Sequence, residues 1–419
     1  MKYSSLNDFI THTPNAIRCV HNVAEVLKER GFIELEEYNH WQKQNENIKG
    51  IYVIRGGSII AVRLPKRLCG FVGVLTHSDS PCFKIKTKPE THSSGYTKLN
   101  VEPYGGSIYY SWLDKPLSIC GEVVDNYNGA KEWVDTKEKY QVFIPSQAIH
   151  INREVNTALS LNPQKDMLPV FACGNQSDFL GMIEVEAGVN SMRAYDLSLY
   201  NPEPVKTLNM GKHQIAMGPR LDNLAAVFSG LRIFESEVLE EGTLANDNFA
   251  QVFVAFNSEE IGSATYEGAN GNFLTSVLER ICNMYEAEKY VIFANSIFLS
   301  IDAAHAIHPN APEKSDPTNP VKFGEGVVIK HNANYAHTLY LESKIKGICN
   351  YNNIKVQDFY SRSDMRCGST LGNISMSHHG IETLDIGIPM LAMHSAVETI
   401  CLDDMNHLEN LLFEYYKTW

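Results

Sequence analysis

The chain has 419 residues, a formal net charge of −13, and an ordinary globular composition of 44% hydrophobic and 20% charged residues. The acidic balance argues against a nucleic-acid-binding protein, which usually presents a basic patch. Nine cysteines without a CxxC pair indicate reduced thiols rather than a disulfide framework. The N-terminal segment lacks the apolar run of a signal peptide, and no segment approaches the ~20 apolar residues of a membrane span. We therefore expect a cytoplasmic protein with no membrane partner.

The N-terminal part of the chain predicts one helix and then short strands. Thr13 can cap the helix, Pro14 suits its first position, and Gly31 can end it. Strand-like runs follow at 51–54, 58–62 and 71–75.

The middle of the chain has a different texture from its two ends. Residues 88–212 are rich in Gly, Pro, Tyr and Asn, with strand-like runs at 117–124 and 179–185. We interpret this stretch as a separate, mainly β unit inserted into a domain formed by 1–87 and 213–419.

The last part of the chain alternates between helical and strand patterns. Helices are expected at 222–234 and 272–287 and from about Ser395, with a polar, Pro-rich loop at 310–322. Buried strands are expected at 250–256, 298–301 and 384–388. This alternation predicts an α/β fold with a mixed, largely parallel sheet flanked by helices.

Polar side chains follow the apolar strands, where open α/β sheets place their ligands. They are His77, Asp79, Glu259, Glu260, Asp302, His305, His308 and His394, and Asp222 opens a helix. Singly, each has a plainer explanation. Asp222 or Asp302 can cap a helix, Ser395 with Glu398 forms a capping-box pattern before a helix, and the glutamates can be a solvated strand end.

Together these side chains favour a site for two metal ions. Converging carboxylates repel one another, and divalent cations remove that cost. Imidazole with carboxylate suits zinc, with manganese or cobalt as alternatives, and five ligands suit two ions about 3.5–4 Å apart. One glutamate would remain as a general base.

The sequence resembles the aspartyl aminopeptidase family of dinuclear zinc metallopeptidases over nearly its whole length, in a form similar to the bacterial branch. The matching segments occur in the family's order. They are THSDSPCFKIK (76–86), YGGSIYYSWLDKPLS (104–118), PRLDNLAA (219–226), NSEEIGS (257–263), SIDAAHAIHPNAPEK (300–314), VIKHNAN (328–334), RSDMRCGSTLG (362–372) and LDIGIPMLAMHS (384–395).

The resemblance implies a zinc-exopeptidase-like catalytic domain and a role for each site residue. Glu259 would be the general base that takes a proton from a water bridging the two metals, and Asp79 would orient a ligand. The metal ligands would be His77, Asp222, Glu260, Asp302 and His394, with Asp222 bridging.

The resemblance also implies substrates and an assembly. The family removes N-terminal Asp and Glu from peptides, and Lys330 would bind that acidic side chain; a surface lysine at a strand edge is the alternative. His305 would stabilise the oxyanion, unless it is a structural histidine facing a helix. The inserted unit would form dimers that assemble into a tetrahedral dodecamer. His150 would reach a neighbouring active site, unless it is a β-surface residue. Lys115 stands where the family more often has Arg.

Two other functions stay open on the sequence. One is a dinuclear aminopeptidase, amidase or deacylase of another specificity, which a cation at Lys330 argues against. The other is a non-catalytic assembly or cargo-binding protein on a peptidase scaffold. The presence of both Glu259 and Asp222 disfavours it.

Overall fold

The computed structural model describes residues 2–42, 48–174, 177–236 and 248–419. The chain divides into two compact units. The first comprises Met1–Asp79, Val205–Met393 and Glu398–Trp419, and the second comprises Ser80–Pro204 with the short segment His394–Val397. The main stretch of the second unit therefore runs from Ser80 to Pro204, whereas the sequence predicted 88–212.

The first unit is an α/β structure. Its described helices are α1 (Leu6–Thr11), α2 (Ala16–Glu29), α5 (Leu221–Phe234), α6 (Phe273–Met284), α7 (Lys289–Ala294), α8 (Leu339–Tyr351), α9 (Leu371–His379) and α10 (Leu402–Thr418). Two short 3₁₀ turns cover Glu259–Ile261 and Pro312–Lys314. No helix in the described parts of the chain is both long and apolar enough to cross a membrane.

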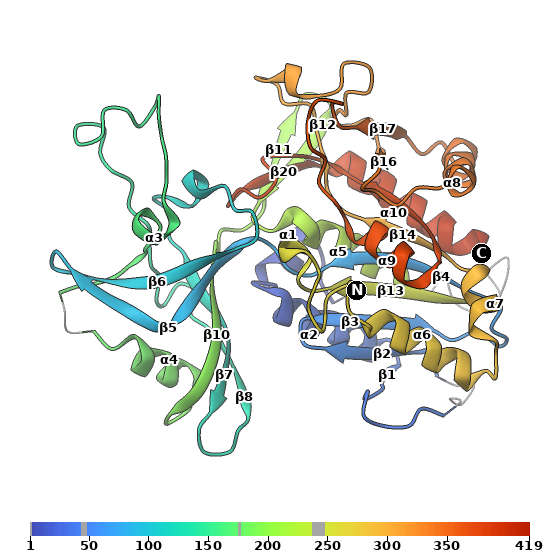
Figure 1. Cartoon of the computed structure of the whole chain (residues 1–419), viewed down its shortest axis with the longest axis horizontal. Coiled ribbons are helices and arrows are strands. Elements are labelled where there is room, and N and C mark those ends of the chain that lie inside the picture. Colours follow the sequence, from blue (N-terminus) through green and yellow to red (C-terminus); the bar gives the residue numbers. More distant parts are fainter. Residues whose placement is uncertain (1, 43–47, 175–176, 237–247) are drawn as a thin grey trace. The chain divides into compact units, whose positions relative to one another are not determined.

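The described residues of this unit form a nine-stranded mixed sheet in the order β1-β2-β3-β13-β4-β14-β18-β16-β17. At its centre β13, β4, β14 and β18 run parallel, and Figure 1 shows β4, β13 and β14 side by side. The strands are β1 (Phe32–Glu34), β2 (Gly50–Arg55), β3 (Ser58–Arg63), β4 (Gly70–His77), β13 (Phe249–Phe256), β14 (Ile297–Ile301), β16 (Val327–His331), β17 (Val356–Tyr360) and β18 (Glu382–Gly387).

A second, five-stranded sheet lies in the described part of the same unit, in the order β11-β12-β20-β19-β15. Its strands are β11 (Lys206–Met210), β12 (His213–Gly218), β15 (Ala304–His305), β19 (Pro389–Leu391) and β20 (Glu398–Cys401).

Strand β4 shows how the large sheet is built into the core. All eight of its residues are buried, so the strand is covered on both faces. Val72 and Val74 belong to a core cluster with α2, α5 and α10, whereas Phe71 and Leu75 belong to a cluster with α6 and α7. This alternation follows from the two-residue period of a strand. A continuous apolar run therefore predicted the strand correctly.

The second unit contains mainly β structure in its described residues, with a six-stranded antiparallel sheet in the order β8-β7-β10-β5-β6-β9. Its core includes Phe83, Trp112 and Phe179. The elements are β5 (Cys82–Ser93), β6 (Tyr96–Tyr104), β7 (Ser118–Asp125), β8 (Lys131–Asp135), β9 (Val170–Cys173), β10 (Met192–Tyr200), α3 (Pro163–Asp166), α4 (Phe179–Ala187) and a 3₁₀ turn (Tyr109–Trp112).

Three sequence-based element predictions are wrong. Helix α2 is capped by Asn15, which accepts from the Arg18 N–H at 3.0 Å, while Thr13 donates its hydroxyl to Phe9 O. The run at 179–185 is helix α4 rather than a strand, because Asp178 caps its start. The last helix begins at Leu402, since the chain from Glu398 forms strand β20.

Candidate active site

His77 ends strand β4 and is 1% exposed. Its Nδ1 lies 3.1 Å from the main-chain oxygen of Asp79. Its Nε2 lies 3.4 Å from Oδ1 of both Asp222 and Asp302. The imidazole therefore has one nitrogen held by its own loop and the other directed at two carboxylates, an arrangement that suits a metal ligand.

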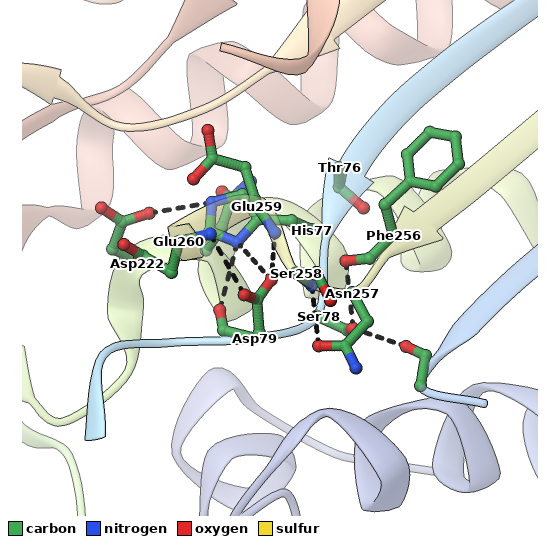
Figure 2. Close-up of polar contacts among 12 residues, drawn as sticks. Thr76, His77, Ser78, Asp79, Asp222, Phe256, Asn257, Ser258, Glu259 and Glu260 are labelled. Carbon is green, nitrogen blue, oxygen red and sulfur yellow. Dashed lines mark hydrogen bonds and ion pairs between the residues drawn. The ribbon is translucent and has the colours of Figure 1, made fainter. Parts of the chain in front are cut away.

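Asp79 joins this loop to the loop after β13. Its Oδ1 accepts from the Glu259 N–H and its Oδ2 from the Glu260 N–H, each at 3.2 Å. Figure 2 shows these contacts beneath the turn that holds both glutamates. The turn lies there because parallel β13 and β4 pair Phe256 with His77, so both strands end at the same edge. One buried carboxylate thus positions an imidazole and two glutamates.

Asp222 does not cap a helix. The N-cap of α5 is Arg220, and Asp222 has non-helical φ and ψ of −82° and 107°. The Asp222 N–H donates to Glu398 Oε2 at 2.9 Å, and the Asn223 side-chain amide donates to Ile301 O at 2.8 Å. The start of α5 is therefore tied to the end of β14, which brings Asp222 beside His77.

Asp302 follows β14 and is not a helix cap either, because the next element is strand β15. Its Oδ1 accepts from the Ala303 N–H at 2.8 Å, and its Oδ2 accepts from Lys330 Nζ at 3.2 Å. Lys330 lies in β16 and is only 2% exposed. A surface lysine at a strand edge is therefore the wrong description of this residue.

The cluster is rich in buried negative charge. Burial raises the pKa of Glu259 to about 8, and nearby carboxylates add to this rise although His77 opposes it. Burial and the charge of Asp222 also raise the pKa of Glu260 well above its usual range. Burial works against protonation of His77, but three carboxylates outweigh it and hold the pKa of the imidazole well above its usual range. Such a set of groups is stabilised by added positive charge.

The donor atoms fit divalent metal ions. One ligand atom each from His77, Asp222 and Asp302 lies within 4.8 Å of the others, and the same holds for His77, Glu259 and Glu260. Imidazole mixed with carboxylate is the ligand chemistry of zinc, manganese and cobalt rather than of calcium.

The structure also gives the surroundings of three other predicted site residues, His394, His305 and His150. His394 belongs to the second unit, has a φ of 66°, and has Nδ1 3.2 Å from Gly106 O. No helix starts at Ser395, so the capping-box alternative is wrong. His305 is exposed in β15, not on a helix, with its ring 6.2 Å from that of Phe359. His150 is exposed in a turn of the second unit.

Two supporting residues were not predicted. Glu398 is 1% exposed and holds the Asp222 N–H, although its spacing from Ser395 suggested a helix cap. Asp385 is fully buried in β18. Its only sequence signal was an acidic residue inside an apolar strand.

An α/β sheet with imidazole and carboxylates gathered at the ends of its parallel strands is the arrangement of a metal-dependent hydrolase. Comparisons with known proteins agree. Residues 9–416 match the family described as aminopeptidase I zinc metalloprotease (M18). The chain therefore belongs to the M18 family, and it is a metal-dependent aminopeptidase.

The similarity to individual relatives extends over nearly the whole chain. A probable M18 family aminopeptidase 2 of Clostridium novyi is 35% identical, over 99% of this chain and 98% of the relative. Its counterpart in Clostridium acetobutylicum is 36% identical, over 98% of each chain. A structure of the Ape4 and Nbr1 complex has a TM-score of 0.92 and 29% identity, over 98% of this chain and 84% of that chain. A dodecamer of S. cerevisiae mApe1 has a TM-score of 0.84 and 25% identity, over 98% and 96%.

Proposed function

We propose that this aminopeptidase removes N-terminal Asp and Glu from peptides, using two divalent ions, zinc in the first instance. The observation that supports the acidic preference is the buried ammonium of Lys330 beside the metal-ligand cluster. The motif VIKHNAN around it resembles the segment of aspartyl aminopeptidases that would bind the acidic side chain.

Lys330 has the surroundings of a carboxylate-binding residue. Its Nζ contacts Asp302 Oδ2 at 3.2 Å and lies 5.4 Å from the ring centroid of Tyr335. A metal ion on Asp302 would draw that carboxylate's charge away from the ammonium. The ammonium would then be available to a substrate carboxylate, and a charge-assisted hydrogen bond in a site shielded from water is a strong one.

His77, Asp222, Glu260, Asp302 and His394 would hold the two ions. When bound, such ions polarise the scissile carbonyl and lower the pKa of water. Glu259 is the general base: its carboxylate takes the proton of the attacking water and returns it to the leaving amine. Asp79 keeps Glu259 in place through the main chain and holds His77 in one orientation.

The remaining assignments rest on the resemblance and on relatives. His305 stabilises the oxyanion. The inserted unit mediates dimers that assemble into a tetrahedral dodecamer, as the dodecamer of yeast mApe1 suggests, and His150 reaches a neighbouring subunit's site. The enzyme works in the cytoplasm.

The test is hydrolysis of matched Asp, Glu, Leu and Lys p-nitroanilides after chelation and after adding back zinc, manganese or cobalt. Metal-dependent cleavage that favours Asp and Glu is the expected result. A preference for Leu or Lys would refute the assignment of Lys330 and leave the metal site standing. No cleavage with any metal by a folded, assembled sample would refute the proposed chemistry.

A further inference from the structure

Asp385 is a buried carboxylate to which the proposed mechanism gives no role. It lies in β18 opposite Ser300 of β14 and is 0% exposed. Burial raises the pKa of Asp385, and this rise is opposed by the charge of Lys330, by the hydroxyls of Ser300 and Thr370, and by the N–H of Ala336. A buried acid surrounded by several elements needs a reason to be there, because its desolvation costs stability.

The strongest contacts of Asp385 are to a single residue of another segment. Its Oδ2 accepts from the Ala336 N–H at 2.5 Å, and its own N–H donates to Ala336 O at 2.8 Å. Both polar groups of Ala336 are therefore held by Asp385. Ala336 follows β16 and directly follows Tyr335, so the clamp fixes the chain that leaves Lys330.

Tyr335 is packed where this clamp would hold it. The residue is 8% exposed, and its ring centroid is 5.4 Å from Lys330 Nζ. A Cβ built on Gly387, two residues after Asp385 in β18, would lie 3.4 Å from Lys330 Cε. The charge of Lys330 also lowers the pKa of Asp385 against the effect of burial. Asp385 thus lies beside Lys330 and also holds the segment that packs against it.

The start of α9 leaves room for this carboxylate. A Cβ on Gly372 would collide with Asp385 Oδ1. Thr370, two residues earlier, is 2% exposed and contributes a hydroxyl near Asp385. Four segments therefore converge on one side chain: β14, β18, the chain after β16, and the start of α9.

We infer that Asp385 is a positioning residue for the Lys330 pocket, one that sets affinity for peptides with an acidic first residue rather than the rate of the chemical step. This inference rests on the proposed function, because it assumes that Lys330 binds the acidic side chain. Without the carboxylate, the Ala336 N–H loses its acceptor, and Tyr335 is no longer fixed against Lys330.

The chain offers a matched control for the test. Asp404 is also 0% exposed and also grips main-chain N–H groups, those of Gly324 and Gly326, at 2.9 and 2.7 Å. These glycines precede β16, whereas Ala336 follows it. Asp404→Ala therefore removes a comparable buried clamp at the other end of the same strand.

The experiment measures kcat and KM of the zinc-loaded full-length enzyme for aspartyl and leucyl p-nitroanilide in Asp385→Ala, Asp385→Asn and Asp404→Ala. We expect Asp385→Ala to raise KM for the aspartyl substrate roughly 5- to 20-fold, with kcat nearly unchanged and little effect on the leucyl substrate. Asp385→Asn, which keeps an acceptor for Ala336, recovers most of this loss. Asp404→Ala lowers the melting temperature without changing the ratio of aspartyl to leucyl hydrolysis.

The failures are distinguishable. A wild type that does not prefer the aspartyl substrate refutes the proposed function and this inference with it. A wild type that prefers it, with a folded Asp385→Ala variant that keeps the preference, refutes the inference alone, as does an equal loss in Asp404→Ala. If Asp385→Ala does not fold, Gly372→Ala decides by the same criteria, since its Cβ displaces the carboxylate.

Discussion

Among the described residues of the first unit, two clusters of imidazole and carboxylate differ in how their charge is balanced. The His77 cluster consists of His77, Asp79, Asp222, Glu259, Glu260 and Asp302, and in it Lys330 Nζ lies 3.2 Å from Asp302 Oδ2. The His331 cluster consists of His331, His337, Glu342, Asp358 and Lys346. In it Lys346 Nζ lies 2.7 Å from Glu342 Oε1 and 2.9 Å from Asp358 Oδ1.

The pKa values of the carboxyl groups in the two clusters reflect this difference in lysine contacts. In the His77 cluster, burial raises the pKa of both glutamates. In the His331 cluster, His331 and Lys346 hold the pKa of Asp358 at about 2, and Lys346 and His337 overcome burial to lower that of Glu342. One atom each of His331, His337 and Glu342 also meets the distances of a metal site. Donor atoms at the right spacing are therefore not enough to make a metal site, because in the His331 cluster Lys346 already contacts both carboxylates.

The largest expected effect comes from exchanging an imidazole in each cluster. His77→Ala should lower zinc content and reduce activity by more than about 10⁴-fold, because the ions supply several kcal/mol of transition-state stabilisation. His331→Ala should leave both nearly unchanged. Metal analysis after dialysis and the aspartyl p-nitroanilide assay check this. Equal loss of zinc in both variants would contradict the prediction that zinc binds at the His77 cluster and not at the His331 cluster.

The next effect comes from exchanging a glutamate in each cluster. Glu259→Gln should lower kcat about 10²- to 10⁴-fold with zinc content unchanged, since it removes general base catalysis alone. Glu342→Gln should retain near wild-type kcat. A fully active Glu259→Gln enzyme would assign the base to another residue.

A smaller effect is expected from the two lysines. Lys330→Met should lower the preference for aspartyl over leucyl p-nitroanilide about 10- to 100-fold, the worth of a hydrogen bond between charged groups. Lys346→Met, with the same change of side chain, should not alter that ratio. Competition between the two substrates in one reaction gives the ratio directly, and an unchanged ratio in Lys330→Met would contradict the pocket.

The smallest effect is on stability against pH. The folded pKa of Asp358 lies below its usual value of 3.8, so its pairing stabilises the fold fully above that value and is lost as pH falls through about 2. Between about pH 5 and about pH 2, Asp358→Asn should therefore lose less free energy of unfolding than the wild type, by less than about 1 kcal/mol, as measured by urea denaturation. An identical loss in wild type and variant would contradict a stabilising role for the charge of Asp358.

The sequence predicted the central strands and the residues at their ends well, because a strand buried on both faces reads as an apolar run that stops at a polar group. It failed for α4, where Ile183 and Val185 suggested a strand and the decisive signals were the cap Asp178 and the left-handed Gly188. Capping by side chains overrode the strand preference of the branched residues.

The His331 cluster and Asp385 could not be predicted for a different reason. Glu342 and Lys346 show a helical i, i+4 spacing, but their link to His331 and Asp358 depends on how α8 packs on β16 and β17. The contacts of Asp385 come from three other segments: β14, the chain after β16, and the start of α9. Such roles are visible only once the fold places the segments together.

The contacts of Asp79 limit how the active site of this enzyme can change during evolution. The Asp79 carboxylate lies 3.4 Å from His77 Nδ1 and accepts from the N–H groups of Glu259 and Glu260. A substitution that lengthens or shortens this side chain therefore moves a ligand and the base together. A substitution of Asp79 therefore cannot adjust the metal ligand without also moving the general base. Variation in substrate range is expected to accumulate around Lys330, which contacts the cluster through Asp302.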